Sequence, residues 1–210
     1  MKEKKWIGKT NGIGLSFYYS GRLEKEASVT DLIDEVKDIA EILNWKYQIF
    51  DTDFPEVELT NGKVDGNLYG ICFAPENCEP IFLCFLSNRH LCSPVNLDEF
   101  LQPVEKVEED AYLIFTKTQY AGPDAHMAVM HVIKHISNKY LEDFKLSDEG
   151  QYWETGDEDL LRKTFKRYSA LIDSFATALE TFSKETGESF EQYFARLLTH
   201  LDKNRNEDGG

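Results

Sequence analysis

The period of the apolar residues changes twice over residues 13–49, and this change most constrains the fold. Apolar residues alternate with polar or small ones over residues 13–19, which is typical of a strand with one buried face. Over residues 29–43 they recur at three-four spacing, which predicts an amphipathic helix. Alternation returns over residues 45–49. The order predicted is strand, helix, strand.

The predicted helix has an acidic solvent face and a recognisable start. Ser28 followed by Asp31 resembles a capping box. The residues expected on the outer face are Asp31, Asp34, Glu35, Asp38 and Glu41.

A hairpin is predicted next. Turn pairs at residues 61–62 and 65–66 precede an apolar strand at 68–73, and a bend at 75–79 leads into a second strand at 81–86. The second strand is apolar on both faces, which predicts a central position in a sheet. Residues 93–110 form a connector with a short helix near 97–101 and an acidic end at 105–110.

A similar plan follows the connector. A strand at 112–115 precedes a helix with a buried stripe over 129–140, a strand around 144–146, an acidic turn and a short returning strand at 151–154. Set beside residues 15–53, this order indicates pseudo-repeat halves at 12–92 and 111–156, with acidic turns at equivalent positions. Chance similarity between two β-α-β stretches remains the alternative.

Two long helices complete the chain. One begins near Asp157 and is stopped by Gly187; the other opens at Ser189 and Gln192 and precedes a flexible tail at 203–210. We therefore predict an α+β fold: a mostly antiparallel sheet built from two β-α-β-β-like units, with the C-terminal helices of residues 157–202 packed on it. Residues 1–202 are predicted to form a single domain.

Charge excludes several partners. The chain carries 38 acidic and 23 basic residues, a formal net charge of −15, with 41% hydrophobic residues to fill a core. Such a balance disfavours nucleic acid and anionic membrane surfaces, because both are bound through lysine and arginine. The apolar run at 81–86 is too short to cross a bilayer, and no signal-peptide pattern opens the sequence. A soluble cytoplasmic protein is expected.

Motifs for cofactors, metals and nucleophiles are incomplete. Glycine patterns near residues 8–14 lack the positions that phosphate-binding loops require. Cysteines 72, 78, 84 and 92 contain no CxxC pair; Cys72 and Cys84 are expected to be buried, and Cys78 exposed. His131 and His135 are one helical turn apart, but the helix places them toward solvent and His126 toward the core edge. We therefore expect no catalytic residue, metal or cofactor.

The densest candidate site is the acidic and aromatic segment 148–159. Its candidate binding residues are Asp148, Glu149, Tyr152, Trp153 and Glu154. Turn and helix-cap chemistry is the competing explanation, since Thr155 or Asp157 fits the N-cap of the next helix.

These observations favour a non-enzymatic, acidic protein-interaction or regulatory module that binds a basic partner, in the manner of an inhibitor or an immunity protein. One alternative is a metal-dependent hydrolase that uses Asp148, Glu149 or Glu154 with a histidine. Another is a small-molecule-binding domain with a pocket between the two halves, lined by tyrosine and tryptophan. A homodimer through the long aromatic helix also stays open.

Overall fold

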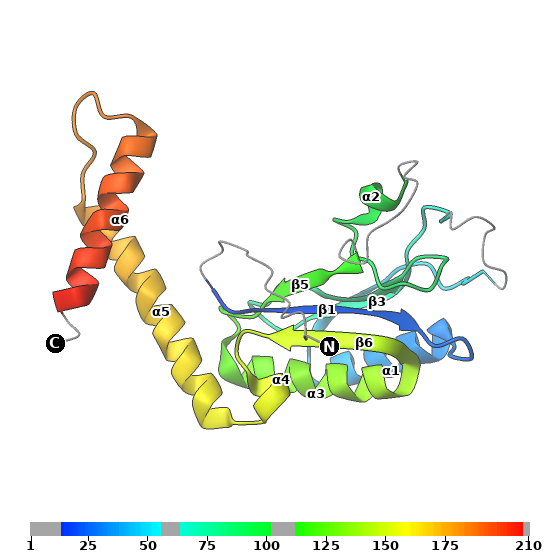
Figure 1. Cartoon of the computed structure of the whole chain (residues 1–210). Helices are drawn as coiled ribbons and strands as arrows, with labels where there is room; N and C mark the ends of the chain where they lie inside the picture. The colour runs from blue at the N-terminus through cyan, green and yellow to red at the C-terminus, as the bar shows by residue number, and fades with distance from the viewer. Residues whose placement is uncertain (1–13, 56–63, 102–111, 208–210) are drawn as a thin grey trace, which may run out of the picture. The chain divides into compact units, whose positions relative to one another are not determined.

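The computed structural model describes residues 14–55, 64–101 and 112–207 (Figure 1). Contacts between Cα atoms divide the chain into two compact units. We call Leu15–Phe165 the sheet unit, and Lys166–Gly210 with Met1–Gly14 the helical unit. The predicted acidic connector at 105–110 and the glycine patterns near 8–13 lie outside the described residues.

The strands of the described residues form two antiparallel sheets of three strands each. In the first, β1 (Ser16–Leu23) lies between β5 (Ile114–Lys117) and β6 (Leu141–Asp148). In the second, β3 (Tyr69–Ala74) lies between β2 (Lys46–Ile49) and β4 (Ile81–Phe85). The α+β class and the antiparallel pairing are confirmed, with two small sheets in place of one.

The predicted hairpin is the β3–β4 pair, but its central strand is β3 and not β4. β4 is apolar on both faces because each face packs in a buried cluster: Ile81, Leu83 and Phe85 on one side and Cys84 on the other. Other groups cover its outer edge. Leu91 bridges Phe85, and the Tyr19 hydroxyl accepts a hydrogen bond from the Phe82 N–H at 2.8 Å and donates one to the Phe82 carbonyl at 2.9 Å. A side chain of β1 thus satisfies backbone groups that a neighbouring strand would otherwise pair.

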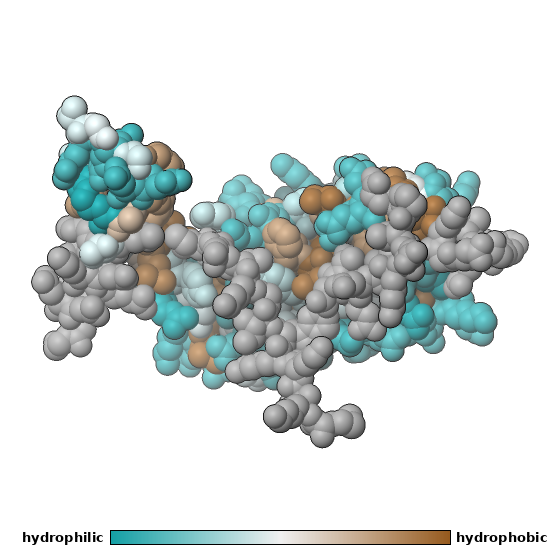
Figure 2. All heavy atoms as spheres, turned by 45° about the horizontal axis from the view of Figure 1, so that its top comes forward, coloured by the Kyte–Doolittle hydropathy of each residue, from teal (hydrophilic) through white to brown (hydrophobic). Residues whose placement is uncertain are grey.

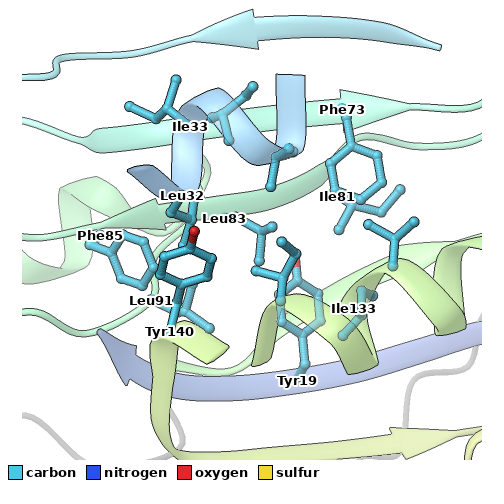
Figure 3. Close-up of a cluster of buried hydrophobic side chains, with 14 of the residues drawn as sticks. Tyr19, Leu32, Ile33, Phe73, Ile81, Leu83, Phe85, Leu91, Ile133 and Tyr140 are labelled. Atoms are coloured by element: carbon cyan, nitrogen blue, oxygen red, sulfur yellow. The ribbon is translucent and has the colours of Figure 1, made fainter. Parts of the chain in front are cut away.

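Helices α1 (Val29–Ile42) and α3 (Gly122–Tyr140) lie side by side against the strands (Figure 1). Their apolar faces meet side chains of β1, β3 and β4 in one buried cluster, part of which is drawn in Figure 3. Tyr19, Leu32, Leu83 and Ile133 show how each element contributes to it. The short helix predicted near residue 97 is confirmed as α2 (Leu97–Leu101).

Both ends of α1 follow from local sequence. The Ser28 hydroxyl accepts a hydrogen bond from the Asp31 N–H at 3.1 Å, as an N-cap should. At the other end Asn44 has a left-handed φ of 54°, and the N–H groups of Asn44 and Trp45 bond to the carbonyls of Glu41 and Ala40. This Schellman arrangement ends the helix and leads the chain directly into β2.

The second half differs from the prediction in its last element. Residues 151–154 do not form a returning strand: α4 (Tyr152–Thr155) is a helical turn that begins after Gln151. The order β-α-β is therefore shared by both halves, whereas the fourth element is β3 in one and α4 in the other. The evolutionary relation between the halves stays a prediction.

The C-terminal helices are α5 (Glu158–Thr181) and α6 (Phe190–Glu207). Asp157 caps α5, since its Oδ1 accepts from the Leu160 N–H at 2.9 Å. α5 ends before Gly187, and α6 runs into the segment expected to be a tail.

The packing of both long helices on the sheet is not confirmed. Leu161 and Phe165, in the first turns of α5, are buried within the sheet unit. The rest of α5 belongs to the helical unit, whose core contains Ala178, Tyr193 and Leu197. Each unit has its own apolar cluster. The single domain of residues 1–202 stays a prediction.

Candidate functional site

The segment predicted as a binding site spans the end of β6, a turn and α4. Asp148 is the last residue of β6, and Tyr152, Trp153 and Glu154 belong to α4. The structure thus brings the predicted residues together, and it also shows what each of their side chains contacts.

The Asp148 carboxylate is buried and accepts hydrogen bonds from the start of α4. Its oxygens accept from the N–H groups of Gly150 at 2.7 Å, Tyr152 at 2.8 Å and Trp153 at 3.1 Å. Burial by itself raises the pKa of Asp148, but His126 and the backbone amides outweigh burial and hold the pKa below its usual value. Asp148 therefore acts as an ionised cap inside the fold.

A buried hydrogen-bonded chain extends from this carboxylate. His126 Nε2 lies 3.0 Å from Asp148 Oδ2, and His126 Nδ1 lies 2.7 Å from the Thr118 hydroxyl. Gly150 covers the pair closely: a Cβ there would lie 2.6 Å from Leu161 and 3.0 Å from the Asp148 carboxylate.

Hydroxyl, imidazole and carboxylate occur here in the order used by nucleophilic enzymes. However, Thr118 and His126 are fully buried, and Asp148 is 5% exposed. A substrate has no approach to the Thr118 oxygen in this structure, so the chain of bonds holds α3, β6 and α4 together. Sequence reasoning placed His126 near the core but missed its partners, because Thr118 and Asp148 come from other elements.

The other two predicted carboxylates also bond to backbone. Glu149 Oε2 accepts from the Ser16 N–H at 2.8 Å, and Glu154 Oε1 accepts from the Asp148 N–H at 3.1 Å. These contacts support the turn and cap explanation for all three acidic residues. The binding assignment itself stays a prediction.

Tyr152 and Trp153 are half-buried against α3 and β6. The Tyr152 hydroxyl lies 3.1 Å from His131 Nε2, and the Trp153 ring packs edge-on against Phe144 with centroids 6.0 Å apart. Lys134 Nζ lies 5.8 Å from the centre of the Trp153 ring. Both aromatic side chains thus help attach α4 to the sheet unit.

His131 and His135 are exposed, as predicted, and bond in different directions. His131 contacts Tyr152, whereas His135 Nε2 lies 2.6 Å from Glu35 Oε1 on α1. Within residues 14–55, 64–101 and 112–207, no three His, Cys, Asp or Glu side chains are grouped to hold a metal ion.

All four cysteines are unpaired thiols. Cys72 and Cys84 are buried as predicted, but Cys78 is half-buried and not exposed, because it packs against the core. Burial raises the pKa of Cys78 to about 12, with a smaller contribution from Glu79, so its reactive thiolate form is disfavoured at neutral pH.

A hollow of about 460 Å³ lies at the start of α1. Its lining includes Lys25, Thr30, Phe54 and Arg89, with no tyrosine or tryptophan. It therefore differs from the aromatic pocket expected for a small-molecule-binding domain.

The outer face of α1 carries a row of exposed carboxylates: Asp34, Asp38 and Glu41, which we call the acidic row. Spacings of four and three place these residues on one side of the helix. In the described part of the chain none of the three forms an ion pair, and Glu41 Oε1 accepts a hydrogen bond from the Tyr47 hydroxyl at 2.8 Å.

Glu35, from the same helix, is already engaged by α3. Its carboxylate lies 2.6 Å from both Lys139 Nζ and His135 Nε2, and it accepts a hydrogen bond from the Tyr140 hydroxyl. The bonds from Lys139 and Tyr140 lower the pKa of Glu35 to about 2. Glu35 thus joins the two helices, whereas the acidic row does not.

The chain matches no protein family, no curated protein and no solved structure. In the described residues no helix is long and apolar enough to span a membrane. Figure 2 shows one face of the molecule, on which hydrophobic residues lie in separate patches among hydrophilic ones.

Proposed function

We propose that the protein is a non-enzymatic interaction module that binds a basic protein partner through the acidic row of α1. The observation that supports this proposal is that Asp34, Asp38 and Glu41 lie exposed on one side of a well-capped helix and form no ion pair with a described residue. Like charges at such spacings destabilise an isolated helix slightly, so a cationic partner would relieve their repulsion.

The distribution of charge supports the same proposal. The sheet unit holds 29 of the 38 acidic and 13 of the 23 basic residues, a net charge of −16. The field of this unit would accelerate encounter with a basic protein, and salt would weaken the effect. Regulation or inhibition of such a partner is the role that we propose.

The internal contacts of the 148–154 segment support a non-enzymatic role. The carboxylates of Asp148, Glu149 and Glu154 each accept hydrogen bonds from backbone N–H groups, and this fixes their positions in the fold. We place the protein in the cytoplasm, where its four unpaired cysteines would stay reduced.

The test is a binding titration with a fluorescent peptide that alternates arginine and threonine. Asp34→Asn/Asp38→Asn/Glu41→Gln removes the acidic row with little change in shape. At about 0.5 kcal/mol for each exposed charge pair, three pairs predict affinity about tenfold weaker in low salt. Anisotropy at about 20 mM and about 300 mM salt measures both the loss and its screening.

A matched variant separates a defined surface from net charge. Asp173→Asn/Glu180→Gln/Glu191→Gln removes the same number of exposed acidic groups from the helical unit. We expect less than about a twofold loss for it, because those charges lie outside the acidic row. Equal losses in the two triple variants, or no binding by the natural chain, would overturn the proposal.

A further inference from the structure

β2 is an edge strand of its sheet among the described residues. It pairs with β3, and no described residue pairs with its other edge. The Phe50 N–H bonds to the Gly70 carbonyl at 2.8 Å, so the alternation of an antiparallel ladder turns the N–H and C=O groups of Lys46 and Gln48 toward β3. Those of Tyr47 and Ile49 point away from it. This edge offers backbone groups for one more strand.

The side chains on this edge continue the apolar face of the sheet. Tyr47 lies opposite Phe73, and Ile49 lies opposite Ile71. Phe73 and Ile71 are buried in the main core, whereas Tyr47 and Ile49 remain 38% and 39% exposed. A strand added beside β2 would cover both side chains.

Glu41 is the member of the acidic row that lies at this edge. Its Oε1 accepts a hydrogen bond from the Tyr47 hydroxyl at 2.8 Å. At about 100° per residue, Asp34, Asp38 and Glu41 fall within about 60° of one another, and Glu35 points about 60° or more beyond them, toward α3. Residues of an added strand that face α1 would therefore lie next to Glu41.

We propose that the outer edge of β2 takes an extended segment of a basic partner protein as an additional antiparallel or parallel strand. Lysine or arginine at every second position would lay its aliphatic stem over Tyr47 and Ile49 and reach the acidic row with its charged end. The choice of a basic segment rests on the proposed function. A second copy of the chain is the less favoured occupant, because two sheet units of net charge −16 repel each other.

Proline at position 49 tests the backbone part of this inference. Ile49→Pro removes an N–H that faces away from β3, so the β2–β3 ladder keeps its bonds. Ile49→Ala is the matched control that removes the side chain and keeps the N–H. We expect binding of the arginine–threonine peptide to weaken at least about fivefold more in Ile49→Pro than in Ile49→Ala, with both variants folded by circular dichroism.

A second measurement covers the case in which Ile49→Pro does not fold. Two further peptides are made with backbone N-methyl groups on alternate residues, one methylated at the odd positions and the other at the even positions. Each is titrated against the natural chain. One of the two methylated peptides should bind about tenfold more weakly than the other, because only one set of alternate N–H groups faces β2.

The outcomes distinguish this inference from the proposed function. Equal affinity for the unmethylated and both methylated peptides, still dependent on the acidic row, would overturn strand addition and leave the charged surface in place. Absence of binding to any peptide would overturn both. Self-association that Ile49→Pro abolishes, measured by sedimentation, would overturn the choice of a basic partner.

Discussion

Asp148 shows at the scale of one residue why an acidic side chain in a conspicuous motif can serve the fold. Its carboxylate accepts from three backbone N–H groups and lies against the buried His126 ring. If this carboxylate is removed, buried N–H groups are left without an acceptor. The loss in the free energy of unfolding then exceeds what the hydrogen bonds themselves contribute.

Asp148→Asn should therefore destabilise the protein strongly. The amide nitrogen of asparagine cannot accept the N–H bonds that a carboxylate oxygen accepts, so we expect a loss of about 3 kcal/mol in the free energy of unfolding. Urea denaturation at neutral pH measures it. Asp157→Asn, the same change at the exposed N-cap of α5, should cost less than about 0.5 kcal/mol. Similar losses in both variants would show that Asp148 is not an internal cap.

At the scale of elements, the sequence predicts those helices and strands whose apolar residues recur at a regular spacing. α1, the β3–β4 pair and the start of α5 follow from apolar spacing and from capping residues such as Ser28 and Asp157. α4 was mistaken for a strand because its first N–H groups bond to Asp148, whose position depends on His126 in another element. Contacts of that kind carry no local signal.

The candidate site shows the same limit. The segment containing Trp153 and Glu154 was recognised from its composition, but the bonds that occupy its carboxylates reach back to Ser16 and across to α3. The acidic face of α1 was predicted from periodicity. The edge position of β2 could not be predicted. It depends on which strands pair with one another, and the sequence of β2 alone does not encode that pairing.

The contact between α1 and α3 predicts a dependence on pH. The pKa of Glu35 is lowered to about 2 in the folded chain from a usual value of 4.5, chiefly by Lys139 and Tyr140. A lowered folded-state pKa adds stability above the unfolded value, and that stability is lost as the pH falls from about 4.5 toward about 2.

The expected contribution is about 1 kcal/mol, because 24% of the Glu35 side chain stays exposed and solvent screens the pair. The free energy of unfolding, measured by denaturation, should be lower for Glu35→Gln than for the natural chain by this amount at pH 6. The difference should shrink toward pH 2.5. Lys139→Met should reduce the same difference. A difference in the free energy of unfolding between the natural chain and Glu35→Gln that does not change with pH would contradict this account of the α1–α3 contact.

At the scale of the whole molecule, the negative charge is unevenly divided. The sheet unit carries net charge −16 while the chain as a whole carries −15, so the remaining residues nearly balance. Within the sheet unit, many carboxylates are committed to caps, turns and the α1–α3 contact. The acidic row lies exposed on α1, and its Glu41 is bonded to Tyr47 on β2.

The most direct test is to map the amide signals of the ¹⁵N-labelled chain while the arginine–threonine peptide is added. We predict that the largest shifts fall on residues 34–49, with Tyr47 and Ile49 gaining protection from hydrogen exchange. Shifts centred on Tyr152 and Trp153, or spread evenly over the sheet unit, would contradict an interaction surface formed by α1 and β2.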